Sequence, residues 1–207
     1  GERTPRLLAV SKKQSIESIY TLARAGIREF GENYVQEGVA KIQYCQQHHP
    51  ELHIIWHHIG AIQSNKTQLI AENFDWVQGI DRLSIAEKLN KYRESHATPL
   101  QVCIQININK ENQKSGIDPE KTADFLAEMQ AFQHLKVRGL MTLPAADQTT
   151  VQSQATFNEM RLLFTEINDK LLKLDTLSMG MSEDFECAIQ AGSSLVRIGT
   201  ALFGARP

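Results

Sequence analysis

Lys12 follows a run of mostly apolar residues, and an amine in that setting can attack a carbonyl. The predicted strand 7–11 (Leu-Leu-Ala-Val-Ser) would place Leu8, Val10 and Lys12 on one face, because side chains alternate along a strand. Loss of hydration there favours the neutral amine, which is the nucleophilic form toward an aldehyde. Lysines are also common where a strand meets solvent, so the residue could simply mark the strand's end.

Two loops near the carboxyl terminus combine glycine with hydroxyl side chains. One is Ser178–Ser182 (Ser-Met-Gly-Met-Ser), and the other is Arg197–Thr200 (Arg-Ile-Gly-Thr). Glycine lets a backbone approach a ligand closely, and free amides near a helix start bind phosphate. Either loop alone could be a tight turn, with Ser182 as a helix cap. Together they favour a phosphate site made of Ser178, Ser182, Gly199 and Thr200.

Arg197 should point into the interior of the fold. Val196 and Ile198 would lie on the opposite strand face, where aliphatic side chains suit contact with helices. A buried guanidinium needs a partner, since leaving the charge unpaired is strongly destabilising. That partner could be Glu32 or Asp81, or it could be the nitrogen of a heteroaromatic ligand.

An amine, a phosphate cradle and an arginine for a ring nitrogen are the three contacts expected for pyridoxal 5'-phosphate. Lys12 would form an imine with the cofactor's aldehyde. Arg197 cannot readily give up a proton, so the ring nitrogen would stay unprotonated and the ring would be a weak electron sink. These residues therefore predict a site that holds the cofactor but stabilises carbanions poorly.

The elements that would position these residues alternate regularly. Eight strand patterns and seven helix patterns predict one α/β domain over residues 1–207, a (β/α)8 TIM barrel. An open doubly wound sheet is the alternative, but its first turn is usually rich in glycine, and here that turn is Ser-Lys-Lys-Gln. The predicted strands are 7–11, 28–30, 53–59, 76–80, 101–108, 137–143, 177–179 and 195–199, and the predicted helices are 15–25, 34–47, 65–73, 83–94, 119–132, 149–172 and 184–191.

One helix is missing from this count. Because the chain starts at Gly1 and not at Met, we expect a leading helix upstream of Leu7 in the native gene product, absent from this chain. In a TIM barrel, ligands bind at the carboxyl ends of the strands, and phosphate binds after the last two. Lys12, the pair Glu32–Asn33, and both hydroxyl-rich loops fall at such ends.

Composition excludes several other classes of protein. The net charge of -2 and pI of about 6.4 give no basic surplus for nucleic acid. No apolar run is long enough to span a membrane. The three cysteines lack metal-ligand spacing, which indicates a reduced, cytoplasmic protein. His53, His57 and His58 could suggest a metal, but alternation separates neighbours, and we expect none.

These motifs resemble the pyridoxal phosphate homeostasis proteins, also called PROSC or YggS proteins. The similarity covers nearly the whole chain in several ordered blocks, which makes it specific. The blocks are Ala9–Lys12, Phe30–Tyr34 with Gln36 and Glu37, Trp56–His57 through Ile59–Gly60, Gln63–Lys66, Ile106–Asn107, Lys114–Gly116, Arg138–Met141 with Pro144, Ser178–Ser182, Val196–Gly199 and Phe203–Gly204.

The resemblance implies a fold like the amino-terminal barrel of alanine racemase, with the cofactor bound as an imine to Lys12. It also implies that Asn33 lies beside the cofactor, that Ser178, Ser182, Gly199 and Thr200 lie near its phosphate, and that Arg197 faces its ring nitrogen. The sequence departs from the family at Lys13–Gln14, where Thr-Lys is frequent, and at His58, where Phe is common. Lys13 could compete for the imine.

The expected function is intracellular homeostasis of pyridoxal phosphate, as a carrier or buffer without turnover that could pass the cofactor to apoenzymes. We expect a monomer. The alternative is a pyridoxal phosphate-dependent amino-acid racemase, which needs a base on each face of the imine; relatives take one from a second domain, and this chain ends at Pro207. A cofactor-free aldolase using Lys12 would leave Arg197 unexplained.

Overall fold

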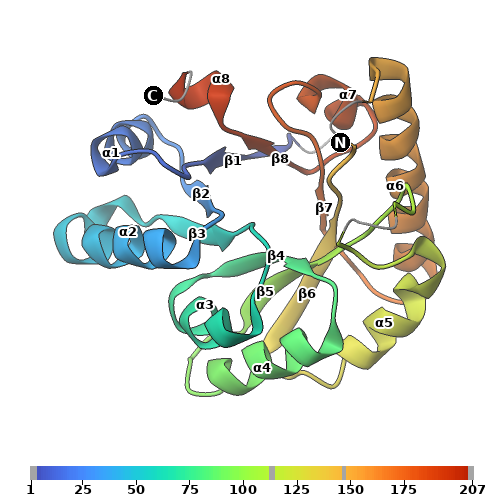
Figure 1. The fold of residues 1–207 in the computed structure, drawn as a ribbon, viewed down its shortest axis with the longest axis horizontal. Helices are drawn as coiled ribbons and strands as arrows, with labels where there is room; N and C mark the ends of the chain where they lie inside the picture. Colours follow the sequence, from blue (N-terminus) through green and yellow to red (C-terminus); the bar gives the residue numbers. More distant parts are fainter. Residues whose placement is uncertain (1–3, 112–114, 146–147, 205–207) are drawn as a thin grey trace.

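Eight parallel strands close into a barrel in the computed structural model, which describes residues 4–111, 115–145 and 148–204 (Figure 1). Neighbours in sequence pair along the sheet, and the first strand pairs with the last, with Leu8 beside Arg197. The predicted TIM barrel is confirmed. The strands are β1 (Arg6–Val10), β2 (Glu29–Glu32), β3 (Ile55–His58), β4 (Trp76–Ile80), β5 (Leu100–Gln105), β6 (Leu135–Met141), β7 (Thr176–Ser178) and β8 (Leu195–Ile198).

Helices surround this barrel on the outside (Figure 1). Short 3-10 turns precede α3 and α5, and another, Pro50–Leu52, precedes β3. The α-helices are α1 (Ile16–Arg24), α2 (Val35–His48), α3 (Thr67–Asn73), α4 (Leu83–Arg93), α5 (Thr122–Met129), α6 (Thr150–Lys170), α7 (Phe185–Gln190) and α8 (Thr200–Phe203).

Local sequence explains where several helices begin. The Ser15 hydroxyl accepts a hydrogen bond from the Ser18 amide at the start of α1. Thr149 and Gln152 form a reciprocal capping box at the start of α6. A short helix, α8, which the sequence patterns did not include, follows β8 from Thr200; its four residues are too few to show a helical period.

Two strands differ from the prediction in ways that affect the site. β2 continues to Glu32, because Gly31 and Glu32 pair with His57 and His58 of β3. This long-range pairing outweighs the tendency of Gly31 to end a strand. β5 ends at Gln105 instead of continuing to residue 108. Lys114, which the family resemblance includes, lies outside the described residues.

The space between sheet and helices holds the main apolar core, which includes the fully buried Phe30, Phe74 and Phe157. The inside of the barrel differs from it. His57, Gln78 and Ser178 point inward and have no exposed surface. Barrel interiors are usually filled by branched aliphatic side chains, so the polar filling here requires a reason.

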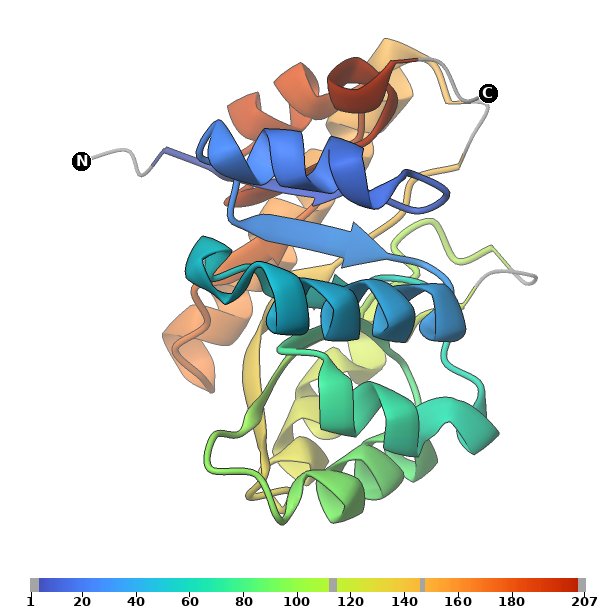
Figure 2. The same ribbon diagram turned by 90° about the vertical axis from the view of Figure 1, so that its left-hand side faces the viewer.

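All strands run in one direction, so their carboxyl ends meet at one end of the barrel. The arrow of β2 in Figure 2 points toward this end, where the C-terminal end of the described chain also lies. Residues from distant parts of the sequence therefore gather there, as the sequence analysis expected for Lys12 and Arg197.

His58 predicts a loss of stability in acid. It is fully buried against Phe74, and neither ring nitrogen has a hydrogen-bond partner of ordinary geometry. Burial lowers the pKa of His58 to about 4. The unfolded state would bind a proton more readily than the folded state between pH 6.5 and about 4, so unfolding free energy should fall by about 3 kcal/mol as pH drops through this window.

The substitution His58→Phe should remove this dependence and raise stability at neutral pH, because an apolar ring replaces a buried imidazole that has only weakly aligned backbone contacts at Gly60 and Ala61. Urea unfolding measured across this pH range checks it. The matched control, His48→Phe, alters an exposed ring and should keep the acid loss. An unchanged pH profile in His58→Phe would contradict the assignment.

Candidate functional site

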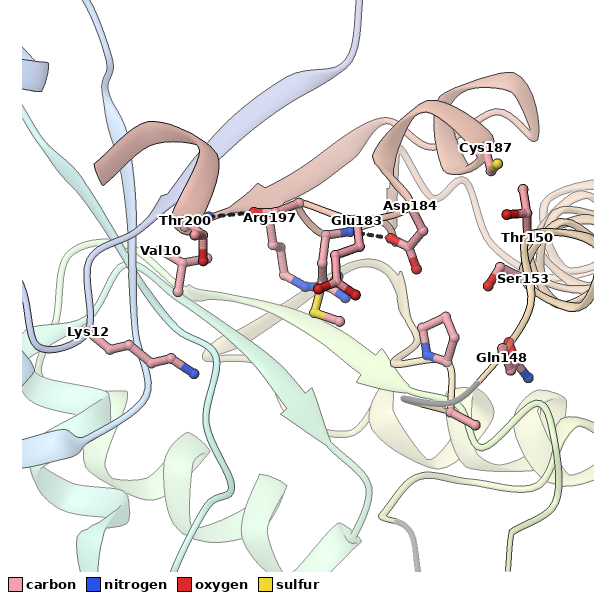
Figure 3. A pocket seen from close by; sticks show the side chains of 15 residues that line it. Val10, Lys12, Gln148, Thr150, Ser153, Glu183, Asp184, Cys187, Arg197 and Thr200 are labelled. Carbon is pink, nitrogen blue, oxygen red and sulfur yellow. Dashed lines mark hydrogen bonds between the residues drawn. The ribbon is translucent and has the colours of Figure 1, made fainter. Parts of the chain in front are cut away.

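A pocket of about 470 Å³ opens at the carboxyl ends of β1, β6, β7 and β8 (Figure 3). It brings together five of the seven predicted site residues, whereas Asn33 and Ser178 are not among its lining residues. The predicted residues that line it are Lys12, Ser182, Arg197, Gly199 and Thr200, and the others are Val10, Pro144, Ala145, Gln148, Thr150, Ser153, Met181, Glu183, Asp184 and Cys187.

Lys12 lies in the loop that follows β1, and its side chain extends into the pocket from the β1 side (Figure 3). The next residue, Lys13, has a φ of 59°, in the left-handed region. Such a turn is unfavourable for a residue with a side chain and requires support from its surroundings.

That support comes from an ion network, which we call the Lys41 network: Lys41 and Glu37 of α2, Glu32 of β2, and Ser11, which follows β1. Lys41 Nζ donates to the Ser11 carbonyl at 2.7 Å and to Glu32 Oε1 at 2.9 Å, and it lies 2.6 Å from Glu37 Oε1. Glu37 Oε1 also accepts from the Lys13 amide at 2.5 Å. Both sides of Lys12 are therefore tied to the same ammonium.

Glu32 completes this network. It is fully buried, and its Oε1 accepts from the Ser11 hydroxyl at 2.5 Å. Burial raises the pKa of Glu32, and the Ser11 and Lys41 contacts oppose this without cancelling it. Because β2 includes Glu32, its side chain faces α2 and not the barrel interior. Glu32 therefore does not pair with Arg197, although it was one of the two carboxylates considered as a partner for that guanidinium.

Asp81 does not pair with Arg197 either. Its carboxylate accepts from the Gly116 amide at 3.1 Å and from Arg82 at 3.2 Å. Arg197 instead donates to the Ser178 hydroxyl at 2.6 Å and to the Thr142 carbonyl at 2.8 Å, and it is only 4% exposed. Both of these partners are uncharged.

Burial lowers the pKa of Arg197 to about 10, against the opposing effect of Asp184. The guanidinium thus remains charged at neutral pH while its charge is only partly balanced by dipoles. Its place on the pocket wall makes it suited to a ligand atom that accepts a hydrogen bond.

The loops after β7 and β8 converge on one side of the pocket. The Gly199 amide points to Ser182 Oγ at 3.4 Å, and α8 starts at Thr200, so first-turn amides lie there. Gly180 has a φ of 96°, and a Cβ at this position would lie 2.5 Å from the Ala188 Cβ in α7. Glycine is required for this approach. Ser182, Gly199 and Thr200 line the same pocket and offer it hydroxyl and amide donors.

Ser178 and Asn33 lie elsewhere. Ser178 is the last residue of β7, and strand alternation turns it into the barrel, where it contacts Arg197 and Gln78 instead of joining Ser182. Asn33 follows β2, and its Oδ1 is buried without a hydrogen-bond partner. Such an orphaned acceptor is costly unless a ligand or water satisfies it.

These groups fit the pyridoxal phosphate that the sequence predicts. The pocket offers an amine, two loops with hydroxyl and amide donors and a cation with neutral partners, and an amide oxygen without a hydrogen-bond partner lies at the neighbouring strand end. The amine, the donors of the loops and the guanidinium are the groups that an anionic aldehyde with a heteroaromatic ring requires, and the Asn33 oxygen can accept a hydrogen bond from it.

Sequence analysis missed the groups that support the site. The Lys41 network was not predicted, although Glu37 and Lys41 are spaced i,i+4 on one helix, which is a recognisable signal. Thr142 contacts Arg197 only through its backbone carbonyl, which every residue type has, so the sequence could not identify this contact. Gln78 also escaped notice, because a single glutamine inside an apolar strand has no motif.

Histidine placement follows the predicted alternation. His57 stacks on Trp76 at 5.0 Å inside the barrel, whereas His58 contacts Phe74 outside it. The two rings therefore lie on opposite sides of the sheet and cannot share a ligand.

Comparisons with known proteins agree on one family. The model described as alanine racemase, N-terminal domain, matches residues 2–207. The pyridoxal phosphate homeostasis protein of Pasteurella multocida is 50% identical over 207 residues, covering 99% of this chain and 88% of that protein. Its counterpart in Escherichia coli K12 is 48% identical over 203 residues, covering 97% and 85%.

Solved structures have the same fold. PipY of Synechococcus elongatus, with PLP bound, is 34% identical with a TM-score of 0.87, covering 97% of this chain and 92% of that one. Alanine racemase of Clostridium difficile is 15% identical with a TM-score of 0.80, covering 100% of this chain and 54% of that one. The second likeness concerns the fold alone.

The Lys41 network leads to a stability prediction. Lys41→Met should lower unfolding free energy by about 3–5 kcal/mol, because the Glu32 carboxylate stays buried without its cation. Adding Glu32→Gln should recover part of the loss, since both charges are then gone. Urea denaturation of both variants measures this. Lys170→Met, which breaks the exposed i,i+4 pair with Glu166, is the control and should change little. Equal losses in Lys41→Met and Lys170→Met would refute the network's role.

Proposed function

The chain belongs to the alanine racemase N-terminal domain family and, within it, to the pyridoxal phosphate homeostasis proteins, and we propose that it binds pyridoxal 5'-phosphate at its barrel mouth. One observation carries the proposal: Arg197, a buried cation with neutral partners, lines the same pocket as Lys12. The similar PipY was solved with PLP bound, which supports the same ligand here.

Each residue has a distinct role in this proposal. Lys12, held by the Lys41 network, attaches the aldehyde, and Ser182, Gly199 and Thr200 bind the phosphate. Arg197 faces the ring nitrogen, and Asn33 lies beside the cofactor. Ser178, which we first expected near the phosphate, has a different role in this proposal. Its hydroxyl accepts a hydrogen bond from Arg197 inside the barrel and so supports the guanidinium.

The cofactor supplies a reactive aldehyde on an electron-withdrawing ring. Arg197 limits the use of that ring, because a guanidinium does not readily transfer a proton to the ring nitrogen. The ring then withdraws electrons weakly, which suits storage more than catalysis. The relatives' name, homeostasis protein, supports binding and buffering without turnover over racemisation.

Several further expectations remain part of this proposal. Residues 1–207 form one cofactor-binding domain that acts as a monomer and passes the cofactor to apoenzymes in the cytoplasm. Free thiols at Cys45, Cys103 and Cys187 support a reducing compartment. Among the described residues, every helix is too short or too polar to cross a bilayer. Analytical ultracentrifugation with and without the cofactor measures the oligomeric state, and we expect the mass of one chain in both conditions.

Lys12→Ala should abolish the visible absorption band of the lysine-bound cofactor, because the amine that attaches it is gone. Borohydride treatment of the unmodified protein, followed by peptide mass analysis, should place the cofactor on Lys12. Lys13→Ala is the matched control and should keep the band, since Lys13 contributes its amide to Glu37. A band that persists in Lys12→Ala and disappears in Lys13→Ala would assign the attachment to Lys13.

Arg197→Glu should let the ring nitrogen accept a proton, because a carboxylate replaces a guanidinium at that atom. The expected result is a changed spectrum and faster reaction of the bound cofactor with added amino acids. The exposed Arg82→Glu serves as control. If Arg197→Glu keeps both the spectrum and the reactivity of the unmodified protein, the contact between Arg197 and the ring is disproved.

A further inference from the structure

A line of polar side chains crosses the inside of the barrel from beneath the pocket toward the opposite end. It consists of Arg197, Ser178, Gln78, His57 and Glu29, from β8, β7, β4, β3 and β2, and we call it the interior polar network. Ser178, Gln78 and His57 have no exposed surface, and the Glu29 side chain is 12% exposed. Its members come from two groups of strands, β2 to β4 and β7 with β8, which face each other across the barrel.

The hydrogen bonds of this network all run in one direction. Arginine can only donate, so Ser178 Oγ accepts from Arg197 at 2.6 Å and its own proton goes to Gln78 Oε1 at 2.5 Å. The amide nitrogen of Gln78 then faces His57 Nδ1 at 3.0 Å, which must act as an acceptor. The proton of a neutral His57 therefore lies on Nε2.

The last step joins His57 to a carboxylate. His57 Nε2 and Glu29 Oε2 lie 3.0 Å apart, an electrostatic contact without the alignment of a full hydrogen bond. Burial raises the pKa of Glu29, but the contact with His57 and the nearby Arg6 and Arg138 outweigh it, so the net pKa is lowered. The line of hydrogen bonds that begins at Arg197 thus reaches His57, whose Nε2 lies beside the Glu29 carboxylate.

Other charged groups border each end of the network. Lys12 and Asp184 line the pocket with Arg197, and Cys103 of β5 lies on the inner side. Burial raises the pKa of Cys103 to about 12, so this thiol is neutral. At the other end, Arg6 lies 3.4 Å from Glu29. Neither Lys12 nor the anion-binding loops belong to the network.

Stability alone does not explain this arrangement. Apolar side chains of similar shape fill a barrel interior at lower cost than buried amides and imidazoles. Here the polar residues form a connected line that ends on the one side chain assigned to the cofactor's ring. A line of this kind holds a guanidinium in one orientation, because Nη1 and Nη2 have fixed acceptors.

We propose that Gln78, His57 and Glu29 are positioning residues that act through Ser178 to fix the Arg197 guanidinium toward the pocket, with His57 held as the neutral Nε2–H tautomer. The tautomer of His57 and the orientation of Arg197 do not depend on a bound ligand. The identity of the group that Arg197 faces rests on the proposed function.

Measurements on the cofactor-free protein test the proposed tautomer of His57. Nitrogen NMR of histidine-labelled protein should show His57 with a bare Nδ1 that accepts a hydrogen bond and a protonated Nε2. Gln78→Leu should shift the Nδ1 signal, whereas Gln101→Leu should leave it unchanged, because Gln101 contacts Arg138 and not Arg197. An Nδ1–H tautomer in the unmodified protein would overturn the proposal.

Measurements on the protein with bound cofactor test whether the network orients Arg197 toward the ring nitrogen. Gln78→Leu should keep the lysine-bound absorption band, but that band should now change as pH is varied from mildly acidic to mildly alkaline, because a displaced Arg197 leaves the ring nitrogen free to protonate. Gln101→Leu should show the pH-independent band of the unmodified protein. The same pH-independent band in Gln78→Leu would overturn the proposal.

If Gln78→Leu does not fold, Ser178→Ala replaces it. Ser178→Ala removes the hydroxyl that links Arg197 to Gln78, and its control, Ser193→Ala, removes a buried hydroxyl that bonds only backbone carbonyls. We expect the pH-dependent band in Ser178→Ala alone, and its absence would overturn the proposal. Absence of any band in the unmodified protein would defeat the proposed function instead, and the histidine measurement would still decide the orientation.

Discussion

A guanidinium buried against uncharged partners is the constraint on which the rest of this structure depends. Arg197 is held by a hydroxyl and a carbonyl, so the surrounding barrel leaves part of its charge unbalanced. The fold tolerates this because the same side chain reaches a pocket wall. The pocket's chemistry follows from it, since a ligand that accepts a hydrogen bond from Arg197 completes an otherwise costly burial.

Closure of the barrel brings the remaining groups to this arginine. Parallel strands with their carboxyl ends at one rim place the Lys12 loop, the turn after β7 and the start of α8 around one opening. The Lys41 network then fixes the Lys12 loop from outside the sheet, while the interior polar network contacts Arg197 from inside. Two separate polar systems, divided by the β-sheet, therefore support Lys12 and Arg197 on the wall of one pocket.

Much of this arrangement could be predicted from sequence, because strand and helix periods repeat regularly and Lys12 and Arg197 occur where a barrel places its site. The neighbours of Glu32 and Ser178 could not be predicted, because they depend on which strands and helices pack together: Glu32 contacts Lys41 of α2, and Ser178 contacts Arg197 inside the barrel. The role of Lys41 depends on contacts among three elements. Such contacts exist only in three dimensions, although the Glu37–Lys41 spacing gave a local signal.

Pairing of β1 with β8 has a consequence for folding and for the stability of the barrel. Lys12 follows the first strand and Arg197 belongs to the last, so the seam between these strands must form before both can contact one molecule. Contacts between the chain's extremes form slowly, because they close the longest loop. A ligand that contacted both Lys12 and Arg197 would stabilise the paired state of these two strands by mass action.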